Sequence, residues 1–231
     1  MISFNIFKHR DDKKEMEAFY EMFKVTKKTL KSSIKNDKKL AQLMDLLKLN
    51  ENIEKLEEGS KTGHTLRVAY LSKKMAEAAN LQEKEISDVY FAALYHDIGK
   101  AKISPKIIGK PGPLTDEEYE IVKTHVELGT EMLTGLVSDE VIDIIAKHHE
   151  RMDGSGYPKG IVPESTGAKI IAIVDSYDAM TSKRVYNDPK SHDIAFQELK
   201  MCTVPRDQGG IGHLYDQYLV DILIDIESKE A

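Results

Sequence analysis

The chain has 231 residues, of which 41% are hydrophobic and 31% charged, a composition ordinary for a globular protein that buries its own core. Its formal net charge of −6 disfavours a broad nucleic-acid surface, although metals and a few local cations can still hold a phosphate-containing small molecule. The single cysteine, Cys202, excludes an internal disulfide, and the absence of Trp fits a helical class.

The apolar runs are too short for an integral membrane segment, since the longest covers only about residues 170–174. The first ten residues lack a signal-peptide core, so we expect a cytoplasmic protein. Charge is unevenly distributed: residues 1–50 carry 12 Lys and Arg against 7 Asp and Glu, a net +5 that leaves −11 for the remainder. This asymmetry predicts two segments, an N-terminal helical module over residues 1–55 and a larger domain over residues 56–231.

Apolar residues recur at helical spacing through residues 12–49, which predicts two amphipathic helices with a break at Asn36-Asp37. Their basic surface is best explained as a solvated face, with an anionic membrane or an acidic partner as the alternatives. The apolar stripe fits self-association as well as packing onto the larger domain. A homodimer or a regulatory partner bound through these helices therefore stays open.

Helical periodicity continues from about residue 62, and clear start and stop signals separate the expected helices. The first helix is expected to stop near Asn80, a residue that tolerates a left-handed cap. The next is expected over residues 83–96 and runs into His96-Asp97, after which Gly99 gives a helix-stop signal. We therefore expect this dipeptide to face inward at a helix end.

Thr115 and Glu118 form a capping-box signature for the helix expected to carry His125. A further helix is expected over residues 139–150. Residues 151–165 hold too many Gly and Pro for a helix and are expected to form a functional loop. Together these patterns predict an all-α fold. The remaining helices are expected over residues 167–175, 192–201 and 213–227.

Histidines and aspartates gather on these otherwise apolar helices. A lone histidine is more often a satisfied, partly buried residue than a ligand, and His192-Asp193, a second His-Asp dipeptide at a helix start, shows how little two letters prove. The full set differs, because burying several imidazoles and carboxylates is costly unless a metal or a hydrogen-bonded network offsets the cost. The set comprises His64, His96, Asp97, His125, His148, His149 and Asp175.

The chain resembles the HD superfamily of metal-dependent phosphohydrolases, and within it the HD-GYP branch, which hydrolyses the bacterial second messenger cyclic di-GMP. The resemblance covers about residues 60–225 and implies an HD-domain helical bundle. It rests on six segments in order: HTLRVA from His64, HDIGK from His96, KPGPLT from Lys110, HVELG from His125, HHERMDGSGYP from His148 and VDSYDAMTSKRVY from Val174.

The resemblance implies a binuclear metal site in which Asp97 bridges. One metal is held by His64, His96, Asp97 and Asp175, and the other by His125, His148 and His149. Mixed imidazole and carboxylate ligands suit Fe or Mn, with Zn also compatible. Some family members bind a third metal through a glutamate where this chain has Ser60, and the nearby Glu57 and Glu58 are poor substitutes, so we expect two metals.

The implied reaction is hydrolysis of the phosphodiester bonds of cyclic di-GMP by a hydroxide that bridges the two metals, with pGpG, GMP or both as product. Besides Asp97, the catalytic group includes Lys100 and Asp178. Lys100 is expected near the scissile phosphate, where it stabilises developing charge. Asp178 is expected to orient a ligand or Lys100.

Substrate contacts are expected from Lys100, Tyr157, Arg184 and Asn187. Asn187 stands where many relatives have a cation, and the segment after Pro158 is shorter than usual, so the preference among cyclic dinucleotides stays open. Two alternatives are a non-hydrolytic cyclic-dinucleotide receptor and a general HD-type nucleotide phosphohydrolase. The second histidine cluster and the Gly-Tyr-Pro loop count against the general phosphohydrolase, whereas a receptor should retain bound nucleotide.

Overall fold

The structure is a computed structural model and describes residues 38–58, 63–182 and 188–230. Every regular element in these ranges is helical, as predicted. The first predicted N-terminal helix, Ser60, Arg184 and Asn187 lie outside the described residues. The helices are α2 (Lys38–Glu58), α3 (His64–Ala78), α4 (Glu83–Tyr95), η2 (Ile98–Lys102), α5 (Pro105–Ile108), α6 (Asp116–Lys123), α7 (His125–Leu133), α8 (Asp139–Lys147), α9 (Thr166–Thr181), α10 (His192–Met201), η3 (Arg206–Gln208) and α11 (Gln217–Glu230).

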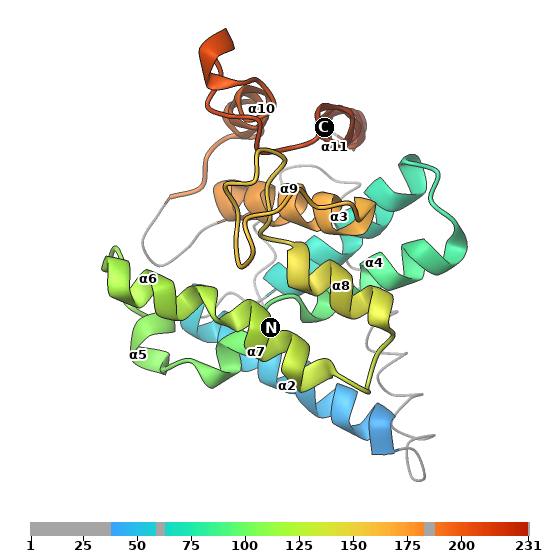
Figure 1. The fold of residues 1–231 in the computed structure, drawn as a ribbon, viewed down its shortest axis with the longest axis vertical. Helices are drawn as coiled ribbons and strands as arrows, with labels where there is room; N and C mark the ends of the chain where they lie inside the picture. The colour runs from blue at the N-terminus through green and yellow to red at the C-terminus, as the bar shows by residue number, and fades with distance from the viewer. Residues whose placement is uncertain (1–37, 59–62, 183–187, 231) are drawn as a thin grey trace.

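The helices form a bundle around α9. Figure 1 shows α10 and α11 at one end, α2 with α5, α6 and α7 at the other, and α3, α4, α8 and α9 between them. Residues 170–174, the longest apolar run of the sequence, are all buried in the middle of α9, which packs against α3, α4 and α8. This run is therefore the centre of the core, because helices surround it on several sides.

Several predicted boundaries are confirmed. Asn80 adopts the expected left-handed conformation with φ 57°, and α4 ends immediately before His96. Thr115 and Glu118 form the predicted capping box of α6. The segment after α8 is a loop whose last residue, Ser165, caps α9. Local signals therefore sufficed wherever a helix begins with a capping side chain.

Five predicted helices are wrong in extent. The helices expected to end at residues 49 and 175 continue to Glu58 in α2 and to Thr181 in α9. The helix expected to carry His125 is two helices, α6 and α7, which meet at Thr124. Helix α8 ends at Lys147 instead of residue 150, so the two following histidines leave the helix axis. The last helix begins at Gln217 instead of His213. At His125 and His148 the imidazole turns toward the interior of the protein, and a continuous helix would hold it elsewhere.

Gly99 is not a helix stop, because it lies inside the 3-10 helix η2. A Cβ atom there would stand 1.9 Å from the backbone oxygen of His125. Only glycine therefore allows η2 to approach α7 this closely. The contact brings Asp97 next to His125.

Helix α2 is a single helix that passes through the predicted boundary between residues 55 and 56. It packs against α3, α4, α5 and η2. The buried carboxylate of Glu54 accepts hydrogen bonds from the backbone nitrogens of Gly63 and Thr65, both at 2.8 Å. Glu54 thus satisfies unpaired N–H groups at the start of α3, next to His64. No helix among the described ranges is long and apolar enough to cross a membrane.

We predict that Glu54→Gln destabilises the protein by about 1–3 kcal/mol, because the amide nitrogen would face a buried backbone N–H that needs an acceptor. Urea unfolding followed by circular dichroism measures the change. Glu51→Gln, at an exposed position of the same helix, should change the free energy of unfolding by less than about 0.5 kcal/mol. Equal effects of the two substitutions would contradict this role of Glu54.

Candidate metal centre

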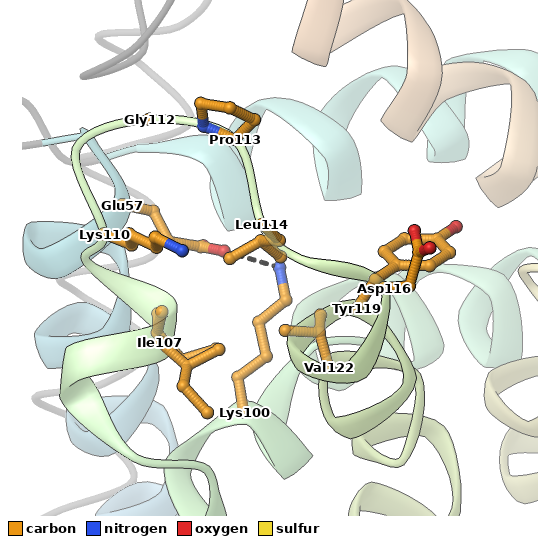
Figure 2. Close-up of a pocket in the computed structure, with 11 residues that line it drawn as sticks. Glu57, Lys100, Ile107, Lys110, Gly112, Pro113, Leu114, Asp116, Tyr119 and Val122 are labelled. Atoms are coloured by element: carbon orange, nitrogen blue, oxygen red, sulfur yellow. Dashed lines mark hydrogen bonds and ion pairs between the residues drawn. The ribbon is translucent and has the colours of Figure 1, made fainter.

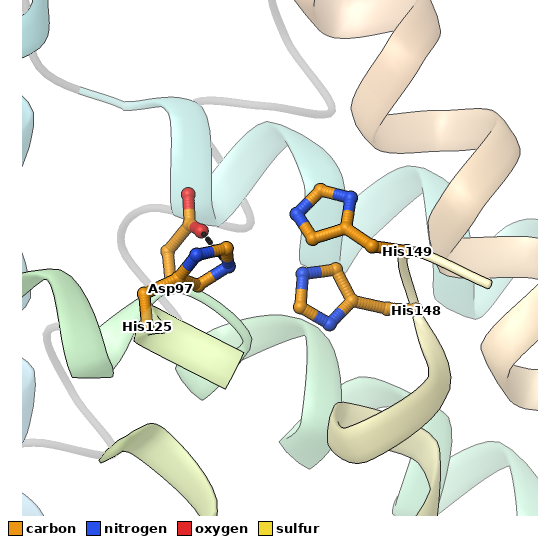
Figure 3. A group of neighbouring side chains, drawn as sticks. All are labelled: Asp97, His125, His148 and His149. Carbon is orange, nitrogen blue, oxygen red and sulfur yellow. Dashed lines mark ion pairs between the residues drawn. The ribbon is translucent and has the colours of Figure 1, made fainter. Parts of the chain in front are cut away.

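The structure brings together all seven metal-site residues expected from the sequence, in two adjacent groups. Within each group, one potential ligand atom per residue lies within 4.8 Å of those of the other members. Figure 3 shows the larger group, with the imidazoles and the carboxylate converging on one space. One group is Asp97, His125, His148 and His149, and the other is His64, His96 and Asp175.

Most of these residues stand at helix ends. His64 and His125 are the first residues of α3 and α7, and His148 and His149 directly follow α8. The dipeptide His96-Asp97 joins α4 to η2, while Asp175 lies within α9. Five separate helix ends or faces are therefore needed to assemble the centre.

Three of the histidines are oriented by the same hydrogen bond. The Nδ1 atoms of His96, His125 and His148 donate to the backbone carbonyl three residues earlier, at 2.8, 2.7 and 2.7 Å respectively. Because a carbonyl oxygen only accepts, Nδ1 carries the proton. Nε2 is then left with its lone pair, as a metal ligand requires.

Two of these Nε2 atoms are orphaned. Nε2 of His125 and of His148 are buried and have no hydrogen-bond partner among the residues that the structure describes. Burial is the main cause that lowers the pKa of both imidazoles. The pKa of His148 falls to about 3, because neighbouring His96 and His125 add to the effect of burial. Neutral imidazoles with unused buried lone pairs are costly without a partner and fit a transition-metal ion well.

Asp97 lies where the two groups meet. Its Oδ1 is 3.3 Å from Nε2 of His125, while its Oδ2 is 3.4 Å from Nε2 of His96 and 3.6 Å from Nε2 of His64. Burial raises the pKa of this carboxyl, but Lys100 and the histidines more than compensate, so the pKa is well below the usual value. An ionised carboxylate with one oxygen toward each group can serve as a bridging ligand.

His64 is oriented differently, by a carboxylate. Its Nδ1 donates to Oδ2 of Asp178 at 2.7 Å, and Arg67 binds the same carboxylate through Nε at 2.6 Å and Nη2 at 3.0 Å. Burial raises the pKa of Asp178, but Arg67 and His64 hold it far below the usual value. Asp178 was expected to orient either a metal ligand or Lys100, and in the structure it contacts the candidate ligand His64. Arg67 was missed, although its position three residues after His64 on one helix face was a usable signal.

Lys100 is not a solvated surface lysine, since its side chain is only 12% exposed. Its Nζ donates to Oδ2 of Asp97 and to Oε1 of Glu57, both at 2.7 Å. Burial lowers the pKa of Lys100, but the two carboxylates raise it well above the usual value, so the ammonium form persists. The partner Glu57 was not expected from the sequence, because the contact depends on how α2 packs against η2.

The Gly-Tyr-Pro loop lies against the same centre. The ring of Tyr157 stacks on the ring of His149 at a centroid distance of 4.5 Å. The buried Glu150 accepts hydrogen bonds from two backbone nitrogens of the loop, those of Lys159 at 2.7 Å and Ile161 at 3.0 Å. A Cβ at Gly156 would stand 2.4 Å from the backbone oxygen of His149, so glycine is needed there too. Tyr157 is thus held beside the histidines.

A family model described as an HD domain matches residues 48–202 of this sequence, and the matched range contains all seven residues of the centre. The chain belongs to the HD-domain family. The match begins inside α2, upstream of the predicted boundary at residue 56.

Named relatives of this HD-domain chain are phosphodiesterases. It is 36% identical to a cyclic di-GMP phosphodiesterase of Thermotoga maritima, over 81% of this chain and 50% of that protein. It is 35% identical to the cyclic di-GMP phosphodiesterase response regulator RpfG of Xanthomonas campestris, over 72% of this chain and 43% of that protein. The chain therefore spans about half the length of the curated relatives it matches, or less.

A solved structure shares the fold. The crystal structure of a cyclic GMP-AMP specific phosphodiesterase of Vibrio cholerae (V-cGAP3) aligns with a TM-score of 0.57 and 17% identity, over 80% of this chain and 48% of that chain. At this level of identity the likeness supports the HD-domain bundle and nothing finer.

The second His-Asp dipeptide lies elsewhere in the HD domain. His192 and Asp193 are exposed in the first turn of α10, after the helix cap Ser191. Nδ1 of His192 lies 2.5 Å from the hydroxyl of Tyr177, which also donates to Glu227. The dipeptide is thus a helix start, as the sequence pattern indicated, and belongs to neither ligand group.

We predict that Asp178→Asn lowers metal affinity by about 10- to 100-fold, because the uncharged amide keeps only one acceptor oxygen for the donors of both His64 and Arg67, so the ring of His64 is held less firmly. Competition with a chromophoric chelator measures the affinity. Asp193→Asn, in the exposed dipeptide, should leave metal affinity unchanged. An Asp178→Asn protein that is folded and binds metal as tightly as the unsubstituted protein would refute the orienting role.

Proposed function

We propose that this chain is a metal-dependent phosphodiesterase that hydrolyses cyclic di-GMP. The observation that carries the proposal is the juxtaposition of two ligand groups, with Asp97 close to histidines of both and with Lys100 and Tyr157 beside them. The relatives named cyclic di-GMP phosphodiesterases support the same substrate class. A general nucleotide phosphohydrolase would need neither the second histidine group nor the Gly-Tyr-Pro loop.

We infer two metal ions, Fe or Mn with Zn as the alternative, because imidazole and carboxylate ligands suit these ions and not Mg or Ca. His64, His96, Asp97 and Asp175 would hold one ion, and His125, His148 and His149 would hold the other, with Asp97 shared. Such ions supply Lewis acidity toward the phosphate oxygens and lower the pKa of an attacking water.

The protein residues position the substrate and stabilise charge. The ammonium of Lys100 is fixed between Asp97 and Glu57 and would face the negative charge that develops on the phosphate. The hydroxyl of Tyr157 stays protonated, because burial chiefly raises its pKa, and it can donate a hydrogen bond to substrate. Arg184 and Asn187, outside the described residues, remain predicted substrate contacts.

We predict that protein reconstituted anaerobically with Fe(II) or Mn(II) hydrolyses cyclic di-GMP, and that Asp97→Ala abolishes turnover by removing the shared ligand. Chromatography that separates pGpG from GMP identifies the product. Asp193→Ala is the matched control and should retain full activity. Binding of cyclic di-GMP without turnover would indicate the receptor alternative, and neither binding nor turnover would refute the substrate assignment.

We predict that Lys100→Met lowers kcat by about 100-fold while metal content is unchanged, because the charge that faces the phosphate is lost but no ligand is removed. Steady-state kinetics and metal analysis of the same preparation test this. Lys102→Met, in the same 3-10 helix but exposed, should retain kcat. A Lys100→Met enzyme with unchanged kcat would show that this lysine only supports the fold.

A further inference from the structure

A pocket of about 430 Å³ opens beside Lys100 (Figure 2). It lies between the end of α2, the short helix α5, the loop that follows it and helix α6. Its volume falls within the range of small-molecule sites, about 300–1,000 Å³, near the lower end. The proposed hydrolysis at the metal centre does not by itself account for this space.

The pocket adjoins the metal centre at two places. Lys100, which lines it, donates a hydrogen bond to Asp97. Tyr119, which also lines it, has its ring 6.5 Å from that of Tyr157, which stacks on His149. A substrate whose phosphate lies at the ligand groups can therefore extend another part into the pocket.

The walls of the pocket suit a flat ring. Ile107, Leu114 and Val122 supply apolar surface, and Tyr119 supplies an aromatic side chain that is 46% exposed (Figure 2). The lining also holds four charged side chains, those of Glu57, Lys100, Lys110 and Asp116. Apolar and aromatic surface beside polar groups suits a nucleobase, which has apolar faces and polar edges. The ammonium of Lys110, another lining residue, is already bound by Glu118.

The polar group nearest to Lys100 in this pocket is the carboxylate of Glu57. Oε1 of Glu57 accepts from Lys100, and the side chain is only 15% exposed. A carboxylate accepts hydrogen bonds and cannot donate them. The Watson–Crick edge of guanine offers two adjacent donors, N1–H and the 2-amino group, whereas adenine places the lone pair of N1 at the corresponding position. The carboxylate therefore favours guanine over adenine.

We propose that this pocket is a guanine subsite, in which Glu57 accepts hydrogen bonds from N1–H and the 2-amino group of one base of the substrate. The inference rests on the proposed function and names the part of the cyclic dinucleotide that the pocket holds. One guanine subsite admits cyclic di-GMP and 3′3′-cyclic GMP-AMP alike, since each has a guanine to place there. Cyclic di-AMP has none and is disfavoured.

The subsite is tested by photolabelling of the manganese-loaded protein with cyclic di-GMP that carries 8-azidoguanine. We expect the label within residues 107–122, the segment that supplies most of the lining residues, and we expect Leu114→Trp to prevent labelling there by filling the space. A label found only elsewhere overturns the subsite. Because labelling needs no turnover, a labelled pocket in a protein that hydrolyses nothing would refute the phosphodiesterase and keep the subsite.

Base selectivity tests the role of Glu57. GMP present before irradiation should prevent labelling at a concentration about tenfold or more below that needed for AMP. Glu57→Gln should reduce this preference for GMP by about tenfold, because an amide can pair with either base. Loss of the ion pair with Lys100 affects GMP and AMP alike and cancels in the ratio. Glu51→Gln, exposed on the same helix, should leave the ratio unchanged. An unchanged ratio in Glu57→Gln, or equal prevention of labelling by GMP and AMP, overturns the assignment.

Discussion

The hydrogen bond from Nδ1 of a histidine to the backbone carbonyl three residues earlier governs this structure, because it serves the helix and the metal centre together. The last carbonyls of a helix have no partner within the helix. In His96 and His148 the imidazole satisfies such a carbonyl at the end of α4 or α8, and in His125 it satisfies one at the end of α6. The same bond turns Nε2 toward the neighbouring ligands. The position where each of these helices ends therefore also determines the direction in which the following histidine presents Nε2.

This constraint explains where the helices stop. The sequence around Thr124 has no glycine or proline, and its apolar periodicity predicts a continuous helix through His125. In the structure Thr124 is the C-cap of α6 and the N-cap of α7, and the short α7 is held against η2 by the close approach at Gly99. The break is set by packing and by the buried imidazole, which propensity does not report.

The sequence was sufficient to predict features that depend on neighbouring residues or on a recognisable motif. The helical class, the caps and the seven clustered residues follow from spacing and from the HD resemblance. Arg67 and Glu57 were not expected to matter, because their partners lie far along the chain: Arg67 binds Asp178 at a separation of 111 residues, and Glu57 binds Lys100 at a separation of 43. Only the packed bundle decides such pairs. Gly99 was misread for the same reason, since its neighbour is the backbone of His125.

Helix α2 carries Glu54 and Glu57 three residues apart, nearly one helical turn, so the two carboxylates share one side of it. One reaches the first turn of the helix that begins with His64, and the other reaches Lys100. Because the helix is unbroken from Lys38 to Glu58, a twist applied near its start turns both carboxylates by the same angle. A single inserted residue before Glu54 would rotate the preceding part of the helix by about 100° relative to these two anchors. The metal centre therefore constrains the rotation of α2 about its own axis more than it constrains the length of the helix before Glu54.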